Sequence, residues 1–244
     1  MTRIYFPGPL AAGLEVRLSP AQAHHAVHVL RMKAGAALTV FNGDGAEHAA
    51  VIARIAKREV FVRVEGASAA QRESPLAVTL VQGISRGARM DYTVQKAVEL
   101  GVVRIEPILT RRGVVRLDGA GVEQKTSHWQ AVAIAACEQS GRNRVPEIAA
   151  VRTFEEWLAR WRAGRGDALG LLLDPAAARR LTELSRPAAG IVLLAGPEGG
   201  LDDDEARAAE QEGLVPVQLG PRVLRTETAA LAAVAAMQAL WGDF

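Results

Sequence analysis

Cysteine is almost absent from this sequence, which has one, Cys137, among 244 residues. A lone cysteine excludes an intrachain disulfide framework and a zinc site built from cysteines, and it fits a reducing compartment. Long apolar runs are also missing. The longest block, residues 229–241, is broken by Gln238 and falls short of the roughly 20 residues that a membrane span needs. Because the first residues lack the apolar core of a secretion signal, we expect a cytoplasmic protein that contacts no membrane.

A strong net charge is lacking as well, since 29 Lys and Arg oppose 27 Asp and Glu. The charge is unevenly placed: the first 74 residues carry nine basic and six acidic side chains, together with four of the five histidines. This basic excess is a mild indication of a polyanionic partner. The hydrophobic fraction of 49% is ordinary for a globular protein and sufficient for one large or two modest domains.

The first part of the chain alternates short strand-like runs with turn residues. We expect strands within residues 37–45, 49–55 and 60–66, with Asn-Gly-Asp-Gly at 42–45 as a turn. Residues 20–32 are predicted to form one helix, with Ser19 as N-cap and a proline in the first position. The pattern is typical of a small antiparallel barrel, and the polar stretch 67–75 indicates a linker. We therefore expect domains at residues 1–72 and 73–244.

The sequence pattern of the second part is typical of an α/β domain with a mostly parallel sheet flanked by helices. Apolar runs alternate with helical stretches there. The predicted strands are 77–83, 103–109, 168–174, 190–196 and 215–220, and the predicted helices are 88–100, 123–139, 153–161, 202–212 and 226–240.

The loop AGPEGGLDDDE, residues 195–205, follows a predicted strand and invites comparison with a phosphate cradle. Phosphate sites use backbone N–H groups at a helix start, commonly with a lysine. Here Pro197 removes a donor, Glu198 lies inside the loop, and three aspartates occupy the positive end of the next helix. The glycines allow close approach of a flat ligand, and the acidic residues favour a positive centre. The alternative is a tight turn with an acidic helix cap.

A second loop of similar construction, LGPRVLRTETAAL at residues 219–231, follows the last predicted strand. We expect Thr226 or Thr228 to cap the next helix, with Arg222 and Arg225 projecting from the turn. Because ligands bind outside the carboxyl ends of strands in open α/β sheets, the two Gly-Pro loops could face one pocket. The helix behind, apolar on nearly all sides, is expected in the core or in a subunit interface.

Other polar motifs are weaker. Arg86 and Arg89 follow one strand end, and Arg142 and Arg144 follow a long helix, where they could contact phosphates or lie on a solvated surface. His24 and His28 lie one helical turn apart, but no third ligand is apparent, so we expect no metal site.

Five motifs in order resemble one family: HHAVHVLRMKAG (24–35), QKAVELGV (95–102), EQSGR (138–142), GPEGGL (196–201) and LGPRVLRTETA (219–229). They are similar to the ribosomal RNA small subunit methyltransferase E family of the SPOUT, or α/β-knot, methyltransferases. The resemblance implies a PUA-like N-terminal barrel and a C-terminal SPOUT domain with a deep trefoil knot. It also implies a homodimer, S-adenosyl-L-methionine as cofactor, and methylation of N3 of a uridine in 16S ribosomal RNA of the small subunit.

The resemblance implies cofactor contacts in three strand-end segments. The residues concerned are Leu172, Leu194, Gly196, Glu198, Gly199, Gly200, Leu219, Gly220, Arg222, Leu224 and Thr226. For RNA binding we expect Arg3, His25, Arg31, Lys33, Arg86, Arg89 and Arg142.

The sequence does not decide which residues assist the methyl transfer. The N3 proton must leave, so a base or a cation that stabilises the developing oxyanion is expected. Candidates are Glu198, Glu138 and Glu227 as base, and Arg142, Arg222 and Arg225 as stabiliser; positioning alone is a further possibility. Two competing functions are a non-catalytic RNA-binding protein with this fold and a dinucleotide-dependent oxidoreductase. The absence of a G-x-G-x-x-G motif opposes the second.

Overall fold

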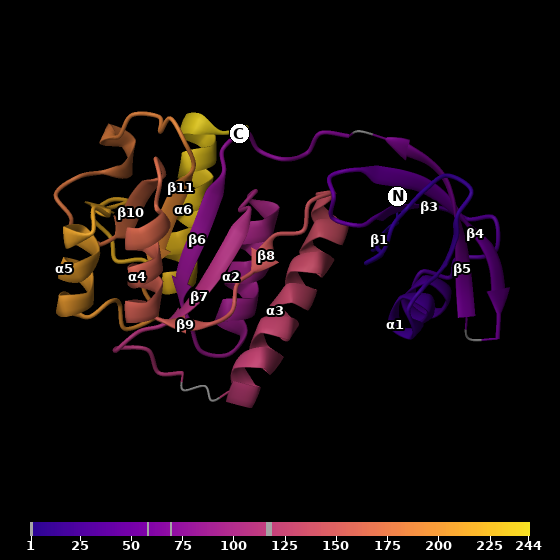
Figure 1. Cartoon of the computed structure of the whole chain (residues 1–244), viewed down its shortest axis with the longest axis horizontal. Coiled ribbons are helices and arrows are strands. Elements are labelled where there is room, and N and C mark those ends of the chain that lie inside the picture. The colour runs from indigo at the N-terminus through magenta and orange to yellow at the C-terminus, as the bar shows by residue number, and fades with distance from the viewer. Residues whose placement is uncertain (1, 58, 69, 116–118) are drawn as a thin grey trace. The chain divides into compact units, whose positions relative to one another are not determined.

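The structure, a computed structural model, describes residues 2–57, 59–68, 70–115 and 119–244, without the side chain of Ala120. The chain divides into two compact units (Figure 1). The first comprises Met1–Glu73 and Cys137–Val145, and the second comprises Ser74–Ala136 and Pro146–Phe244. The expected second domain includes residues 137–145, whereas the structure groups this short segment with the first unit.

The first unit is built on a five-stranded sheet in the order β1-β3-β4-β5-β2. Its strands are β1 (Arg3–Tyr5), β2 (Glu15–Arg17), β3 (Ala37–Phe41), β4 (Glu47–Ala56) and β5 (Glu59–Ser68). Pairing is antiparallel as expected, except that β1 lies parallel to β3. Alternate residues of β3, β4 and β5 point inward and form one buried core. The two short strands β1 and β2 are absent from the sequence prediction.

The helix near the N-terminus begins as predicted and ends early. Ser19 accepts a hydrogen bond from the backbone N–H of Gln22, whose side chain accepts in return from the N–H of Ser19, which forms a capping box before α1 (Pro20–His24). The chain continues as one π-helical turn, His25–Val29. Arg31 then takes a left-handed φ of 54°, so the helix cannot reach residue 32 as expected.

The second unit is built on a wholly parallel sheet in the order β12-β10-β11-β6-β7-β8, with β9 also paired to β7. All five predicted strands are present. The strands are β6 (Val78–Gly83), β7 (Arg104–Leu109), β8 (Glu147–Ile148), β9 (Arg152–Thr153), β10 (Leu169–Leu173), β11 (Ile191–Ala195) and β12 (Val215–Val217). Central strands are apolar on both faces because helices cover both sides.

Helices pack on both faces of this sheet (Figure 1). On one face, α2 (Ala88–Glu99) packs against α6 (Thr226–Trp241), and α6 contacts β6 and β11. On the other face, α4 (Phe154–Gly164) and α5 (Asp203–Gln211) enclose a core cluster in which Phe154, Trp157 and Trp161 are buried. The remaining helix, α3 (Gly119–Ser140), is longer than the predicted 123–139. A single-turn 3-10 helix, Leu181–Glu183, precedes β11.

Candidate functional site

A cavity of ≈ 890 Å³ lies at the carboxyl ends of β10, β11 and β12 in the second unit. These three strands are neighbours or near neighbours in one parallel sheet, so the loops that follow them emerge at the same edge. Its size falls in the range of about 300–1,000 Å³ that is usual for small-molecule sites. The expectation that the two Gly-Pro loops share one pocket is confirmed, and the segment after β10 forms a third wall.

Hydrogen bonds around Gly196 join the loop after β11 to β6 and α6. The carbonyl oxygen of Gly196 accepts from the Thr226 hydroxyl at 2.6 Å and from Nε2 of Gln82 at 3.2 Å. The same amide nitrogen also lies 3.1 Å from the Thr226 hydroxyl oxygen, and the Gln82 side chain is fully buried. Three chain segments distant in sequence are thereby held in one arrangement.

Thr226 does not cap α6, contrary to the expectation that Thr226 or Thr228 does so. The helix starts at Thr226, and Arg225 is the N-cap residue without a side-chain capping hydrogen bond. The Thr226 hydroxyl is committed to Gly196 instead.

The tight turn after β11 depends on glycine. A Cβ added to Gly196 would lie 2.9 Å from the backbone carbon of Gly200 and from the nitrogen of Leu201, closer than such atoms approach. Gly200 itself has φ of +70°, a left-handed conformation that side chains disfavour. The turn therefore brings bare backbone to the cavity wall, where a flat ligand can approach closely.

Glu198 is held by the start of α2. Its Oε1 accepts from the backbone N–H of Arg86 at 2.8 Å and from the guanidinium of Arg89 at 2.9 Å. Partial burial acts to raise the pKa of Glu198, but these hydrogen bonds prevail and the pKa lies below its ordinary value. The carboxylate also complements the positive end of the α2 dipole.

Glu227, in the first turn of α6, also lines the cavity. Its Oε1 lies 3.9 Å from Nε of Arg89, so one arginine stands between two carboxylates. Its Oε2 is buried and has no hydrogen-bond partner among the described residues.

Two cavity-lining arginines, Arg222 and Arg225, carry positive charge on the loop after β12. Both side chains are exposed, and no hydrogen bond or ion pair of either occurs within the described ranges. They are available to a ligand or to an anionic substrate.

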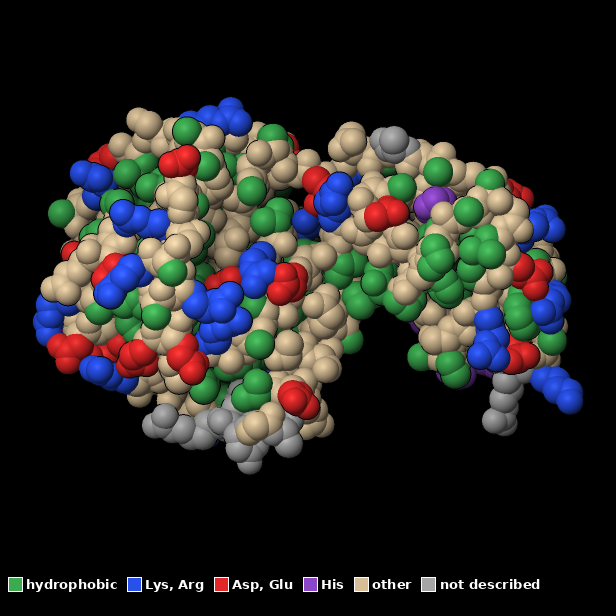
Figure 2. Space-filling view, in the orientation of Figure 1, with side chains coloured by type: hydrophobic (Ala, Val, Ile, Leu, Met, Phe, Trp, Pro, Cys, Tyr) green, Lys and Arg blue, Asp and Glu red, His purple; other side chains and the backbone are tan. Residues whose placement is uncertain are grey.

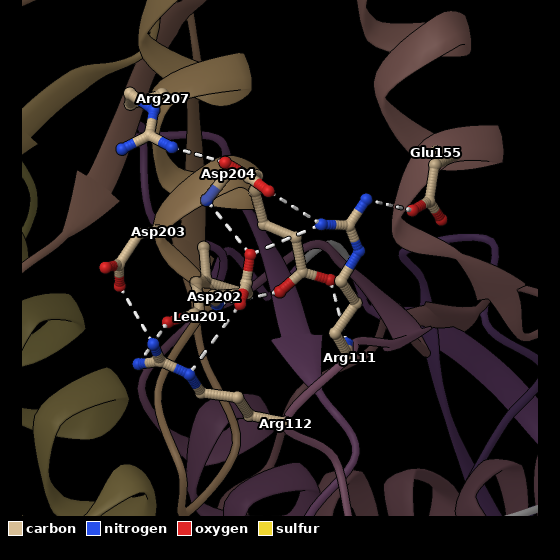
Figure 3. Close-up of polar contacts among 9 residues, drawn as sticks. Arg111, Arg112, Glu155, Leu201, Asp202, Asp203, Asp204 and Arg207 are labelled. Carbon is tan, nitrogen blue, oxygen red and sulfur yellow. Dashed lines mark hydrogen bonds and ion pairs between the residues drawn. The ribbon is translucent and has the colours of Figure 1, made fainter.

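The aspartates that follow the glycine loop are neutralised by the protein itself (Figure 3). Arg111 donates to Asp202 at 3.3 Å and to Asp204 at 3.2 Å, while Arg112 donates to Asp203 at 2.9 Å. The expectation that these carboxylates favour a cationic ligand is therefore corrected: they face the arginines of the loop after β7.

The same acidic segment starts α5. Asp202 is the N-cap, and buried Glu205 completes the capping box by accepting from the backbone N–H of Asp202 at 2.8 Å. The N–H of Asp204, and beyond it Arg111 and Arg112, hold the pKa of Asp202 below its ordinary value. The alternative of an acidic helix cap is thus confirmed for the aspartates.

The predicted cofactor residues gather around the cavity with one exception. Leu194 lies within β11, where its fully buried side chain packs in the core, and it does not line the cavity. The lining residues among those predicted are Leu172, Gly196, Glu198, Gly199, Gly200, Leu219, Gly220, Arg222, Leu224 and Thr226.

The predicted RNA-binding residues fall into exposed and engaged groups. His25, Arg31, Lys33 and Arg86 have exposed side chains. Arg89 is half-buried and paired with Glu198.

Arg3 is built into the first unit. It donates to Glu47 at 2.6 Å and to Asn143 at 2.5 Å, and its guanidinium lies 4.9 Å from the ring centroid of Phe41. This placement gives Arg3 a structural role in the first unit.

Arg142 is also built into the first unit, since its buried guanidinium donates to Glu73 at 2.6 Å. Glu138 lies there too, where it accepts from the backbone N–H of Tyr5, and burial raises its pKa. Neither residue lines the cavity of the second unit.

The sequence analysis did not foresee the polar residues that hold the loops of the site in place, among them Gln82, Arg111 and Arg112. A polar amide at the end of the apolar run AVTLVQG was the available signal for Gln82, since a buried strand interior rarely carries one without a partner. The two arginines directly after a strand end were a comparable signal.

No group of three or more metal-binding side chains occurs within the described ranges. His24 and His28 have ring centroids 4.8 Å apart on the helix of the first unit. Among the described helices, none is long and apolar enough to cross a membrane.

Family models match both units. The RNA methyltransferase domain model matches residues 72–238, and the RNA methyltransferase PUA domain model matches residues 18–65. The first unit is thus PUA-like, and the second is a parallel sheet flanked by helices as expected.

Curated relatives are similar over nearly the whole chain. Ribosomal RNA small subunit methyltransferase E of Buchnera aphidicola is 31% identical, over 99% of this chain and 94% of the relative. The protein of the same name from Bacillus subtilis is 33% identical, over 88% of this chain and 86% of the relative.

Two solved structures are similar to the whole chain in both fold and sequence. Ribosomal RNA small subunit methyltransferase E from Neisseria gonorrhoeae bound to S-adenosyl methionine superposes with a TM-score of 0.92 at 39% identity, covering 100% of this chain and 99% of that one. A Legionella pneumophila protein in complex with the bound cofactor SAM gives 0.93 at 41% identity, with the same coverage.

Proposed function

We propose, because this chain belongs to the ribosomal RNA small subunit methyltransferase E family, that it transfers a methyl group from S-adenosyl-L-methionine to N3 of a uridine in 16S ribosomal RNA. The observation that carries the proposal is the cavity where the two Gly-Pro loops meet at the strand ends. Two similar structures have S-adenosyl methionine bound.

The cavity wall fits this cofactor better than it fits a nucleotide phosphate. Gly196 and Gly200 give a turn without room for side chains, where an adenine could lie against backbone. No lysine is present among the described residues that line the cavity, as a P-loop would require. The residues proposed to hold the cofactor are the lining members of the predicted set, without Leu194. When bound, the cofactor supplies an activated methyl group on a sulfonium.

The chain's own residues would position the uracil and remove its N3 proton. Arg222 and Arg225 offer unpaired cations at the cavity for the RNA backbone or for the uracil oxygens, on which negative charge develops. Glu198 is a poor base because Arg86 and Arg89 hold its carboxylate. Positioning the nucleobase in line with the methyl group adds to the rate.

RNA contact is assigned to exposed basic side chains. Of the residues expected to bind RNA, His25, Arg31 and Lys33 in the PUA-like unit and Arg86 in the second unit have exposed side chains. Arg3 and Arg142 are left out of this set because both guanidinium groups are engaged within the first unit. Acidic and basic side chains are interspersed on the visible face of the second unit, which shows no broad basic area in that view (Figure 2).

The proposal includes the wider family traits. We infer a trefoil knot in the second unit, a homodimer, and action in the cytoplasm on the small ribosomal subunit or a late assembly intermediate. Leu240 and Phe244 are exposed near the end of the apolar helix α6. Exposed apolar side chains there support the proposal that a second copy of the chain binds at this helix.

Calorimetric titration of the purified protein with S-adenosylhomocysteine and with NAD tests the cofactor. Binding of the first alone is expected. Binding of NAD alone would favour an oxidoreductase and overturn the proposal. Binding of neither would favour a non-catalytic RNA-binding protein.

A further inference from the structure

We infer that Glu227 accepts the proton that leaves N3 of the target uridine, an inference that rests on the proposed function. The sequence leaves three glutamates open for this role: Glu138, Glu198 and Glu227. The arrangement of the second unit separates them.

Glu227 has an acceptor that the protein leaves unused. Its Oε2 is buried and finds no hydrogen-bond partner among the described residues, although the residue lines the cavity. A buried polar atom without a partner costs free energy, and more when the group is charged, so such atoms are uncommon without a function. A uracil N3–H entering the cavity would supply the missing donor.

The remaining carboxylates at the cavity are engaged. Oε1 of Glu198 accepts two hydrogen bonds at the start of α2. Asp174 accepts from the backbone N–H of Ala176 at 2.8 Å, and Asp203 pairs with Arg112. Glu138 belongs to the first unit. Glu227 is therefore the lining carboxylate with a free buried oxygen.

The step balances as a proton transfer coupled to methyl transfer. The N3–H proton passes to Oε2 of Glu227, and the electron pair left on N3 forms the new bond to the methyl carbon. The bond from that carbon to sulfur breaks, its electron pair goes to sulfur, and Glu227 returns the proton to water. Nε of Arg89 lies 3.9 Å from Oε1 of Glu227, so a cation stands beside the carboxylate that takes the proton.

Two other roles for Glu227 must be distinguished. A glutamate in the first turn of a helix is commonly placed there to complement the helix dipole. A carboxylate at this position could also balance the sulfonium charge. If Glu227 only complements the helix dipole, replacing it changes folding stability alone. If it balances the sulfonium charge, replacing it weakens the binding of S-adenosylmethionine but not that of S-adenosylhomocysteine, which lacks the positive charge.

The test is a single-turnover methyl-transfer assay on small-subunit RNA with labelled S-adenosylmethionine, combined with titrations of both cofactor forms. Glu227→Gln keeps the shape and removes the charge. We expect its rate to fall by about 10²–10⁴-fold, the usual contribution of a positioned base, with both affinities within about threefold of the wild type. Glu210→Gln, on the exposed side of α5, removes a charge elsewhere and should leave the rate unchanged.

A Glu227→Gln rate within about threefold of the wild type would overturn the inference. So would weaker binding of S-adenosylmethionine alone, since that identifies a sulfonium counter-ion. Should Glu227→Gln fail to fold, Glu227→Asp decides: a rate loss above about tenfold at unchanged affinity supports the inference, and an unchanged rate overturns it. A wild-type protein without methyl transfer to RNA would instead refute the proposed function.

Discussion

The hydroxyl of Thr226 donates a 2.6 Å hydrogen bond to the carbonyl oxygen of Gly196, 30 positions earlier in the chain. This contact fixes the first turn of α6 against the loop after β11, and fully buried Gln82 joins both from β6. The cavity therefore depends on a polar junction beneath it as well as on the glycines that line it.

Thr226→Val should weaken the binding of S-adenosylhomocysteine about two- to tenfold, because the variant keeps the shape and removes a net contribution of about 0.5–1.5 kcal/mol. Calorimetry measures the change. Thr228→Val is the matched control, since Thr228 is exposed on the same helix and makes none of the three hydrogen bonds of the junction. Equal affinities for both variants would show that the junction does not support the site.

Glu198→Gln should separate binding from chemistry. The amide oxygen can still accept from the N–H of Arg86, but the charge that pairs with Arg89 is lost, so the start of α2 loosens and the KM for S-adenosylmethionine rises. The rate at saturation should fall less than about tenfold, because a carboxylate with a lowered pKa is a weak base. A loss of about a hundredfold at saturation with unchanged KM would identify Glu198 as the base.

Acid should loosen the first unit through Glu47. Burial acts to raise the pKa of Glu47, but Arg3 at 2.6 Å and Arg72 at 3.6 Å prevail and lower it. Because the folded pKa is depressed, this stabilisation is present above the ordinary value of 4.5 and is lost as the pH falls through the folded value.

Hydrogen-exchange protection of the β3 and β4 amides, corrected for intrinsic rates, should therefore fall between pH 6 and pH 3. In Glu47→Gln the protection should be lower at pH 6 and nearly independent of pH in this range. An unchanged pH dependence in the variant would refute the assignment to Glu47.

Neutralising Arg31 and Lys33 together should weaken RNA binding and flatten its salt dependence. Two lost phosphate contacts should reduce the slope of log affinity against log salt by about 1.4–1.8. Replacing exposed Arg160 and Arg186 in the second unit removes the same charge as a control. If the Arg31 and Lys33 variant keeps both its RNA affinity and the salt dependence of that affinity, the PUA-like unit does not bind the RNA through these residues.

Much of the second unit follows from local pattern. Apolar runs such as residues 190–196 predict buried parallel strands, and the parallel arrangement brings the Gly-Pro loops to one edge. The roles of charged residues did not follow, because they depend on partners far along the chain. Asp202 and Arg111 are separated by 91 positions, and only the folded sheet shows that the carboxylate is neutralised.

The same limit applies to the helix near the N-terminus and to residues 137–145. Ser19 as N-cap and Pro20 in the first helical position predict the start of the helix from local sequence. Its early end could not be predicted in this way, because it depends on the left-handed backbone conformation of Arg31. From the sequence, Arg142 is expected on the surface, but in the structure its buried guanidinium pairs with Glu73. Exposure of long charged side chains is decided by tertiary contacts that sequence spacing does not contain.

Nucleoside mass spectrometry tests the central claim most directly. Small ribosomal subunits that lack the modification would be incubated with the protein and S-adenosyl-L-methionine, and the 16S ribosomal RNA would then be digested. The account predicts one new 3-methyluridine, formed only when the cofactor is present. A methyl group on another atom or another base, or none despite bound S-adenosylhomocysteine, would contradict it.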